Sequence, residues 1–253
     1  MDKTLLKGLM LLEALADQNG KPIPIPVLAE EVGLTKSNTH RTLQTLAHAG
    51  YATRDEVTGN YRSTFKLFEL GAKQMANIDV RQFAASHMRT LVDLTQETVH
   101  LSILDGGSVV YVDKIESAQP VRAYSVLGGH APAYCVATGK ILLAQQSQEF
   151  LKRHLTNLEA YTAATITDLP MLKAELARAA ANGYAMNRGE WRESVGGVAA
   201  PIFDAFGAPA AAIGISGPLE RLSAKRMKEL APAVQEAALN ISRAMGYRKS
   251  STE

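Results

Sequence analysis

Residues 26–51, PVLAEEVGLTKSNTHRTLQTLAHAGY, contain two short helical patterns with a glycine between them. Pro26 suits the first turn of a helix, and Gly33 is placed to end it. Thr35 or Ser37 can cap a second helix. The stripe that we expect to face inward in this second helix consists of Thr39, Leu43, Leu46 and Ala47. Two short helices joined by a glycine-containing turn predict a helix-turn-helix.

The outward face of the second helix carries polar side chains. The residues predicted to face outward are Lys36, Ser37, Asn38, His40, Arg41 and Gln44. In helix-turn-helix proteins the amino-terminal half of the second helix meets base edges in the major groove. Arginine can form paired hydrogen bonds with guanine, and asparagine or glutamine with adenine. The pattern therefore predicts DNA binding, while a helical hairpin whose polar face meets only water stays open as the alternative.

The segment YATRDEVTGNYRSTFKL, residues 51–67, predicts a β-hairpin. Its strands are expected at 51–54 and 60–64, and a hairpin directly after a helix-turn-helix forms a winged helix. Arg54 and Arg62 flank this wing, where they can reach phosphates or the minor groove. Phosphate contacts of this sort contribute affinity and salt dependence rather than sequence preference.

Two further helical patterns belong to the first third of the chain and its exit. The helix expected at 4–18 would bury Leu5, Leu9, Leu12 and Leu15. The linker helix expected at 65–79 would bury Leu67, Leu70 and Met75. We therefore expect a winged helix-turn-helix domain at 1–64 and a second domain at 80–253.

Strand patterns dominate the second domain. TVHLSILDGGSVVYVDKIES, residues 98–117, is two β runs around a hairpin signal, and VRAYSV, residues 121–126, is a third run. Further strands are expected at 184–190, 194–204 and 208–218. Helices are expected at 132–145, 169–184 and 219–246. Six strands joined mostly by hairpins, with helices at the start, middle and end, predict an α+β domain on an antiparallel sheet.

The composition is that of a globular protein. The 253 residues are 46% hydrophobic and 21% charged, which is enough for one large or two modest domains with real cores. The net charge is only +2, so no strong overall field attracts nucleic acid. From residue 35 to residue 66, however, five basic residues stand against two acidic ones. This modest basic patch covers the predicted DNA-binding elements.

Several classes of function lack their sequence signals. The single cysteine, Cys135, allows no intrachain disulfide and no cysteine-based zinc site, and inert packing is a stronger interpretation than redox sensing. The motifs of nucleotide-binding loops, zinc proteases and serine hydrolases are absent, so we expect no cofactor, no metal site and no catalytic residues. Without a secretory signal or an apolar run of roughly 20 residues, we expect a cytoplasmic protein that spans no membrane.

The segment NRGEWRESVGGVAAPIFD, residues 187–204, allows two interpretations. Glu190, Arg192, Glu193 and Ser194 can be read as an acid, base and nucleophile set. They can also form one wall of a pocket that binds a ligand without changing it.

Three segments resemble the IclR family of bacterial transcription regulators. GLTKSNTHRTLQTL, residues 33–46, is similar to the recognition segment of the family, and GGHAPAYCVATGKILLA, residues 128–144, is similar to its central pocket helix. The most specific match is GYAMNRGEWRESVGGVAAPIFD, residues 183–204. Two positions depart from this pattern: Asn187 replaces an acidic residue or serine, and Gly197 replaces cysteine, serine or alanine. The resemblance covers nearly the whole chain.

The resemblance implies a GAF-like second domain that binds a small effector and thereby alters DNA affinity. In the family the effector is commonly a small carboxylate, such as a keto acid or an aromatic acid. The pocket positions carried over to this chain are Ala123, Ala131, Ala137, Thr138, Asn187, Val195, Gly197, Gly214 and Ser216. Free N–H groups in the first turn of the central helix can hold a carboxylate there. The alternative is that these small residues only let the helix pack close to the sheet.

The small side chains at these positions predict the size of the ligand. Missing bulk in a pocket wall leaves volume that a ligand can fill, so we expect an aromatic carboxylate of hydroxybenzoate size rather than a two- or three-carbon keto acid. Nearby residues that can contribute are Tyr124, His130, Tyr134 and Trp191. Alternation along the run at 121–126, however, turns Arg122 and Tyr124 away from Ala123 and the pocket.

Three functions remain open on the sequence. The first is an effector-responsive regulator that binds a pseudo-palindromic operator as a homodimer or a dimer of dimers, because one winged helix reads too few bases for specificity. The second is an enzyme that uses Glu190–Ser194. The third is a DNA-binding scaffold with a vestigial ligand domain.

Overall fold

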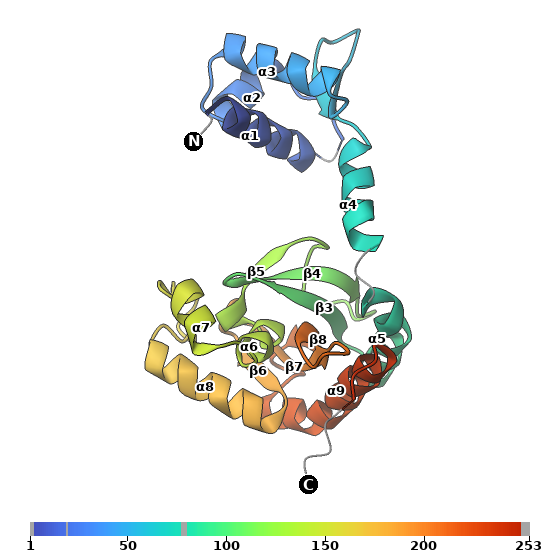
Figure 1. Cartoon of the computed structure of the whole chain (residues 1–253), viewed down its shortest axis with the longest axis vertical. Coiled ribbons are helices and arrows are strands. Elements are labelled where there is room, and N and C mark those ends of the chain that lie inside the picture. The colour runs from blue at the N-terminus through green and yellow to red at the C-terminus, as the bar shows by residue number, and fades with distance from the viewer. Residues whose placement is uncertain (1–2, 19, 77–79, 249–253) are drawn as a thin grey trace. The chain divides into compact units, whose positions relative to one another are not determined.

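The structure is a computed structural model that describes residues 3–18, 20–76 and 80–248 (Figure 1). The chain divides into two compact units, Met1–Asn77 and Ile78–Glu253. Each unit has its own hydrophobic core. Among the described residues, none of the helices combines the length and the hydrophobicity that a membrane crossing needs.

The first unit is a winged helix-turn-helix, as predicted. Its elements are α1 (Lys3–Asp17), α2 (Ile25–Glu31), α3 (Lys36–His48), β1 (Ala52–Arg54), β2 (Tyr61–Ser63) and α4 (Lys66–Ala76). Leu11, Leu15, Leu28 and Leu43 are completely buried in its small core. The N-cap of α3 is Thr35, whose hydroxyl accepts a hydrogen bond from the backbone N–H of Asn38.

The proline-containing segment before α2 joins the wing. Ile23 forms an antiparallel bridge with Tyr61, in which each backbone N–H donates to the other residue's carbonyl at 2.8 and 3.0 Å. The hairpin β1–β2 therefore gains a third partner on the Tyr61 side. Because Tyr61 is also 2% exposed, the wing is attached to the helical core by both backbone and side chain.

The predicted inward stripe of the first helix is partly wrong. Leu15 is buried as predicted, but Leu5 and Leu9 are 63% and 49% exposed, and Leu11 and Ala14 are buried instead. The reason is that only the carboxyl-terminal half of α1 is covered by the core, so its inward face runs through Leu11, Ala14 and Leu15. In α4, Leu70 is also 41% exposed rather than buried, and the side chain of Met75 lies outside the described residues.

The second unit is an α+β domain on an antiparallel sheet, which confirms the predicted fold class. Its strands are β3 (Thr98–Asp105), β4 (Ser108–Ile115), β5 (His130–Pro132), β6 (Ala185–Arg188), β7 (Val195–Phe203) and β8 (Pro209–Pro218). Their order in the sheet is β5-β4-β3-β8-β7-β6, and every neighbouring pair is antiparallel. The pairing of β3 with β8 joins two strands that are far apart in the sequence and places residue 100 opposite residue 214.

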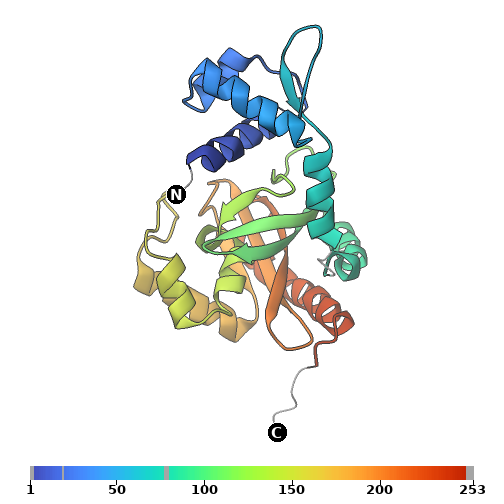
Figure 2. The ribbon, with the colours of Figure 1, turned by 45° about the horizontal axis from the view of Figure 1, so that its top comes forward.

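Helices cover both faces of this sheet (Figures 1 and 2). They are α5 (Val80–Thr95), α6 (Ala137–Leu143), α7 (Gln148–His154), α8 (Leu169–Asn182) and α9 (Ala224–Ala244). One core cluster joins α5 and α9 to strand residues such as Val198 and Ile213. A second cluster joins α6, α7 and α8 to Ala199 and Ala212. Because successive strand residues enter different clusters, β7 and β8 are apolar on both faces.

Two expected elements differ in the second unit. Residues 121–126 are not a strand, and the third strand is His130–Pro132 instead. Side chains, rather than a neighbouring strand, donate hydrogen bonds to the backbone of this segment. Arg221 donates to the Val121 carbonyl and Lys114 to the Ser125 carbonyl. The helix expected at 132–145 is also divided. A short 3₁₀ turn, Ala133–Cys135, precedes α6 because Val136 is extended.

Candidate functional site

The predicted DNA-reading face of α3 lies on one side of the helix. Thr39 and Leu43 are buried, while Lys36, Ser37, Arg41 and Gln44 are exposed and Asn38 and His40 are half-buried. Arg41 donates from Nη2 to Asn38 Oδ1 at 3.1 Å, so two of the predicted reading residues contact each other. His40 differs from its neighbours because its ring packs edge-to-face with Tyr61 at a centroid distance of 6.5 Å.

The two wing arginines occupy different environments. The β1–β2 register pairs Arg54 with Tyr61 and Thr53 with Arg62, which places the arginines on opposite faces of the hairpin. Arg54 folds back on the turn and donates from Nε to the Gly59 carbonyl at 3.4 Å. Both side chains belong to exposed residues. Arg62 has the freer guanidinium of the two for a phosphate.

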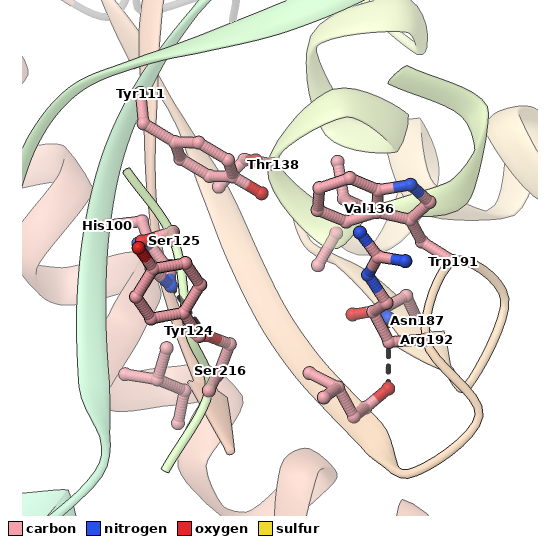
Figure 3. Close-up of a pocket in the computed structure, with 15 residues that line it drawn as sticks. His100, Tyr111, Tyr124, Ser125, Val136, Thr138, Asn187, Trp191, Arg192 and Ser216 are labelled. Carbon is pink, nitrogen blue, oxygen red and sulfur yellow. Dashed lines mark hydrogen bonds between the residues drawn. The ribbon is translucent and has the colours of Figure 1, made fainter. Parts of the chain in front are cut away.

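The second unit contains a cavity between the sheet and the start of α6 (Figure 3). Its volume is about 50 Å³. The residues that line it are His100, Tyr111, Ala123, Tyr124, Ser125, Val136, Ala137, Thr138, Asn187, Trp191, Arg192, Val195, Gly214, Ile215 and Ser216. They come from five strands, from α6 and the residue before it, and from the loops at 116–129 and 189–194. The order of the strands in the sheet therefore creates this site.

Most of the predicted effector residues meet at this cavity. Ala123, Ala137, Thr138, Asn187, Val195, Gly214 and Ser216 are part of its lining, whereas Ala131 and Gly197 are not. Ala131 is buried in β5. At Gly197, a Cβ atom would lie 2.7 Å from the Ile215 carbonyl oxygen and 2.9 Å from Asn187 Oδ1. The absent side chain at position 197 therefore makes room for Asn187 rather than for the cavity.

Gly214 also allows a close approach between strands. A Cβ atom there would lie 2.7 Å from the Cβ of Ala199. The space that glycine frees at positions 197 and 214 is thus occupied by the protein itself. The inference of ligand size from missing side-chain volume therefore applies only to Ala123 and Ala137. The aromatic residues of the lining are the stronger argument for an aromatic ligand.

Among the nearby residues, the structure places Tyr124 and Trp191 in the lining, and His130 and Tyr134 elsewhere. The expectation that Tyr124 turns away from the cavity is wrong, because residues 121–126 form no strand and the alternation rule does not apply to them. Arg122 is exposed and pairs with Glu116 at 3.2 Å.

His100 is the central polar residue that the sequence did not indicate. Its Nε2 lies 2.6 Å from Ser216 Oγ, and its Nδ1 lies 3.3 Å from Ser125 Oγ. Burial, assisted by the positive charge of Lys114, lowers the pKa of His100 to about 4. The imidazole is therefore neutral at pH 7 and has one N–H to donate. The only signal in the sequence was a histidine within a predicted strand.

Two hydroxyl groups in the lining are open to the cavity. Tyr111 is 6% exposed and Thr138 is 5% exposed, and neither side-chain hydroxyl forms a hydrogen bond within the described residues. Burial raises the pKa of Tyr111 to about 12, so its phenol keeps its proton and can donate. Neither hydroxyl oxygen belongs to the fully buried polar atoms without a partner, so both are accessible from the cavity. Both hydroxyls can therefore donate to a molecule in the cavity.

Glu190 belongs to a buried ion pair behind the cavity. Its carboxylate pairs with the ammonium of Lys140 in α6, a residue with no exposed surface. Lys140 Nζ also donates to the Met186 carbonyl at 3.2 Å and lies 3.8 Å from Glu175 Oε1. Burial raises the pKa of Glu190, and the nearby Lys140 opposes that rise. The carboxylate is thus engaged by a framework lysine.

The segment 189–194 is held in place by its backbone. Thr162 and Thr165 donate from their hydroxyls to the carbonyls of Gly189 and Glu190, each at 2.6 Å. Gly189 N–H donates to Val195 O at 2.9 Å, and the N–H of Val195 donates to Arg192 O at 2.9 Å. Ser194 and Glu193 are exposed. The four residues that suggested catalysis therefore do not converge on one point.

The remaining chemistry-bearing groups are structural. Cys135 is fully buried, and burial raises the pKa of its thiol to about 12, so it remains protonated and unreactive. In the part of the chain that the structure describes, no three His, Cys, Asp or Glu side chains gather as a metal site.

Two family models match this chain. The IclR helix-turn-helix domain matches residues 4–56, and the model described as "Bacterial transcriptional regulator IclR C-terminal" matches residues 72–243. The HTH-type transcriptional regulator KdgR of Escherichia coli (strain K12) is 37% identical over 246 residues, which cover 96% of this chain and 93% of KdgR.

Solved structures agree with these matches. The crystal structure of the Thermotoga maritima IclR is 31% identical with a TM-score of 0.80 and covers 98% of this chain and 100% of its own. An IclR homologue from Microbacterium hydrocarbonoxydans, crystallised with 4-hydroxybenzoate, has a TM-score of 0.83 over 96% of this chain and 99% of its own. At 23% identity, that second likeness concerns the fold alone.

Proposed function

The chain belongs to the IclR family of bacterial transcriptional regulators, and on that premise we propose that it is a repressor or activator whose operator binding responds to a small carboxylate. It is a transcriptional regulator with a helix-turn-helix DNA-binding domain and an effector-binding carboxyl-terminal domain. The observation that carries the proposal is the cavity of the second unit. The hydroxyls of Tyr111 and Thr138 are open to this cavity, and the same chain carries an exposed polar recognition helix.

We propose that α3 reads bases in the major groove through Lys36, Ser37, Asn38, His40, Arg41 and Gln44. Arg41 is exposed, and an arginine side chain can form paired hydrogen bonds with guanine. Arg54 and Arg62 would add phosphate contacts from the wing, with Arg62 the freer of the two. Such contacts set affinity and its dependence on salt.

We further propose a homodimer or a dimer of dimers on a pseudo-palindromic operator. One recognition helix contacts too few base pairs for specificity, and a two-fold pair doubles the site with half-sites about one helical turn apart. The first unit has apolar surface that a second copy can cover: Leu9, Phe65 and Phe68 are 49%, 83% and 72% exposed. A protein that binds operators in a bacterium acts in the cytoplasm.

The effector that we propose is an aromatic carboxylate of hydroxybenzoate size. Tyr111, Tyr124 and Trp191 provide aromatic surface in the cavity lining, and Val136 and Ile215 provide apolar surface. Tyr124 is 84% exposed, so its rotation can enlarge the present cavity. The alternative is a small keto acid, which would leave much of this apolar surface uncovered.

We propose no catalytic role for Glu190–Ser194. Glu190 forms an ion pair with Lys140. Ser194 is exposed, and within the described residues its side chain forms no hydrogen bond to a base. A serine nucleophile needs an adjacent base. A DNA-binding scaffold with a vestigial ligand domain is the remaining competitor.

A thermal-shift panel and a gel-shift assay test this function together. The panel compares hydroxybenzoates with two- and three-carbon keto acids, and we expect only the aromatic acids to raise the melting temperature. The same acids should change the mobility shift of DNA from upstream of the gene. Stabilisation by keto acids alone would reject the aromatic effector. Insensitivity to every acid would favour the scaffold, and a ligand recovered in altered form would favour the enzyme.

A further inference from the structure

Arg192 is a cation at the cavity without an internal counter-ion. It is an exposed residue that also contributes to the lining, and within the described residues its guanidinium forms no ion pair. No aspartate or glutamate contributes to the same lining, and His100 is neutral. Among the described residues of the lining, Arg192 is therefore the side chain that carries a full charge, and this charge is positive.

Contacts of Arg192 and its neighbours in the loop define the position of its guanidinium. Its guanidinium stacks over the ring of Trp191 at 4.7 Å from the ring centroid, and Figure 3 shows both side chains on the same side of the cavity. Stacking of this kind keeps the guanidinium plane defined while its N–H groups remain available. The backbone of Arg192 accepts a hydrogen bond from Val195, and the Ser194 carbonyl accepts one from Leu219 N–H at 2.8 Å. Together with the hydrogen bonds from Thr162 and Thr165 to the carbonyls of residues 189 and 190, these bonds anchor the loop before and after Arg192.

Glu190 explains why the charge is still available. This carboxylate lies two residues before Arg192 and would be its natural partner, but it is buried against Lys140 in α6. Glu193 is exposed, as Arg192 is, but it does not line the cavity. The loop therefore separates its charges, with the acidic group inside the domain and the guanidinium at the cavity.

We propose that Arg192 is the anion-binding and specificity-determining residue of the effector site, with the hydroxyls of Tyr111 and Thr138 as neutral donors to the same ligand. This inference rests on the proposed function and specifies which side chain recognises the carboxylate. A planar guanidinium binds a carboxylate through two parallel hydrogen bonds. Uncharged analogues of the same shape, such as carboxamides, would lose this interaction and keep the apolar contacts.

The test measures the preference of the full-length protein for a carboxylate over its amide. Isothermal titration compares 4-hydroxybenzoate with 4-hydroxybenzamide, and pyruvate with pyruvamide, in wild type, Arg192→Gln and Arg188→Gln. Arg188 is the matched control because it is exposed, carries the same charge and does not line the cavity. Trp191, the only tryptophan, reports occupancy independently through its fluorescence.

We expect Arg192→Gln to weaken binding of the acid by about tenfold, since a charge-assisted hydrogen bond contributes at least about 1.5 kcal/mol. Binding of the amide should be unchanged, and Arg188→Gln should behave like wild type. An equal loss in Arg192→Gln and Arg188→Gln, or no loss in either, would overturn the inference while leaving the proposed function in place. If wild type binds neither acid, both the proposed function and this inference are overturned.

Discussion

The DNA-binding unit and the effector-binding unit assemble their functional side chains in opposite ways. The proposed reading residues of the first unit all lie between positions 36 and 44 of one helix. The cavity of the second unit takes residues from position 100 to position 216, and it exists because β3 pairs with β8 and α6 lies against the sheet. A surface built from one helix is changed by one substitution. A cavity built from distant segments depends on the framework that holds them together.

Arg41→Ala gives the largest expected effect, and it should be confined to DNA binding. Loss of a paired contact to a base costs about 1–3 kcal/mol at each half-site, so a two-fold complex should lose at least roughly thirtyfold in affinity. In a gel-shift assay we expect no specific complex. Lys152→Ala, which removes a charge from the exposed side of α7, is the control.

The same Arg41→Ala variant must retain ligand binding for the comparison between the units to hold. Its titration curve with the effector should overlay that of wild type. Loss of ligand binding would show that the two sites are not separable in the way the two cores indicate.

Glu190→Ala should give the next largest effect, on the framework of the second unit. Removing Glu190 leaves the buried ammonium of Lys140 with only Glu175, whose Oε1 lies 3.8 Å away, and loss of one partner of a buried ion pair typically costs about 3–5 kcal/mol. Urea unfolding followed by the fluorescence of Trp191 measures this unit directly, because the chain has one tryptophan. Glu193→Ala removes an exposed carboxylate from the same loop and should change stability by less than about 0.5 kcal/mol. Equal stability of the two variants would show that the pair is not a framework element.

The smallest expected effect is the pH dependence of stability that arises from His100. Its pKa is about 4 in the folded protein and returns to its ordinary value of 6.5 on unfolding. Between these values the unfolded chain binds more protons, so stability is fully present above pH 6.5 and falls as the pH falls toward 4. The slope should reach at most about 1.4 kcal/mol per pH unit.

His100→Gln should remove this part of the pH dependence, as measured by urea unfolding at several pH values between 4 and 7. His130→Gln changes an exposed histidine of β5 and serves as the control. An unchanged slope in His100→Gln would mean that the buried imidazole does not account for acid sensitivity.

The two units also differ in how much of their structure could be predicted from the sequence. The helix-turn-helix followed from local patterns: Gly33 as a stop, Thr35 as a cap, and Thr39 and Leu43 as the buried stripe. The same local reasoning failed for α1, where the inward face depends on which half of the helix the core covers. It failed again at residues 121–126, where the side chains of Arg221 and Lys114 bond the carbonyls of an irregular segment. Neither donor is close to that segment in sequence.

The cavity shows the same division at single residues. Thr138, Asn187 and Ser216 were expected from the family resemblance and lie in the lining. His100 and Tyr111 were not expected, because a histidine or tyrosine in a strand gives no local sign of the cavity that it faces. The role assigned to small residues also changed, since the space beside Gly197 is filled by Asn187 and Ile215.

The sequence by itself determined the family, the order of the two units and the recognition helix, because periodicity, caps and glycine stops act within a few residues. Only the tertiary structure decided where the charged side chains of segment 187–204 lie. It turns Glu190 inward to Lys140 of α6 and leaves Arg192 at the cavity beside Trp191. Both residues lie in one loop, and their separation arises because burial of a charge requires a partner that only a distant helix supplies.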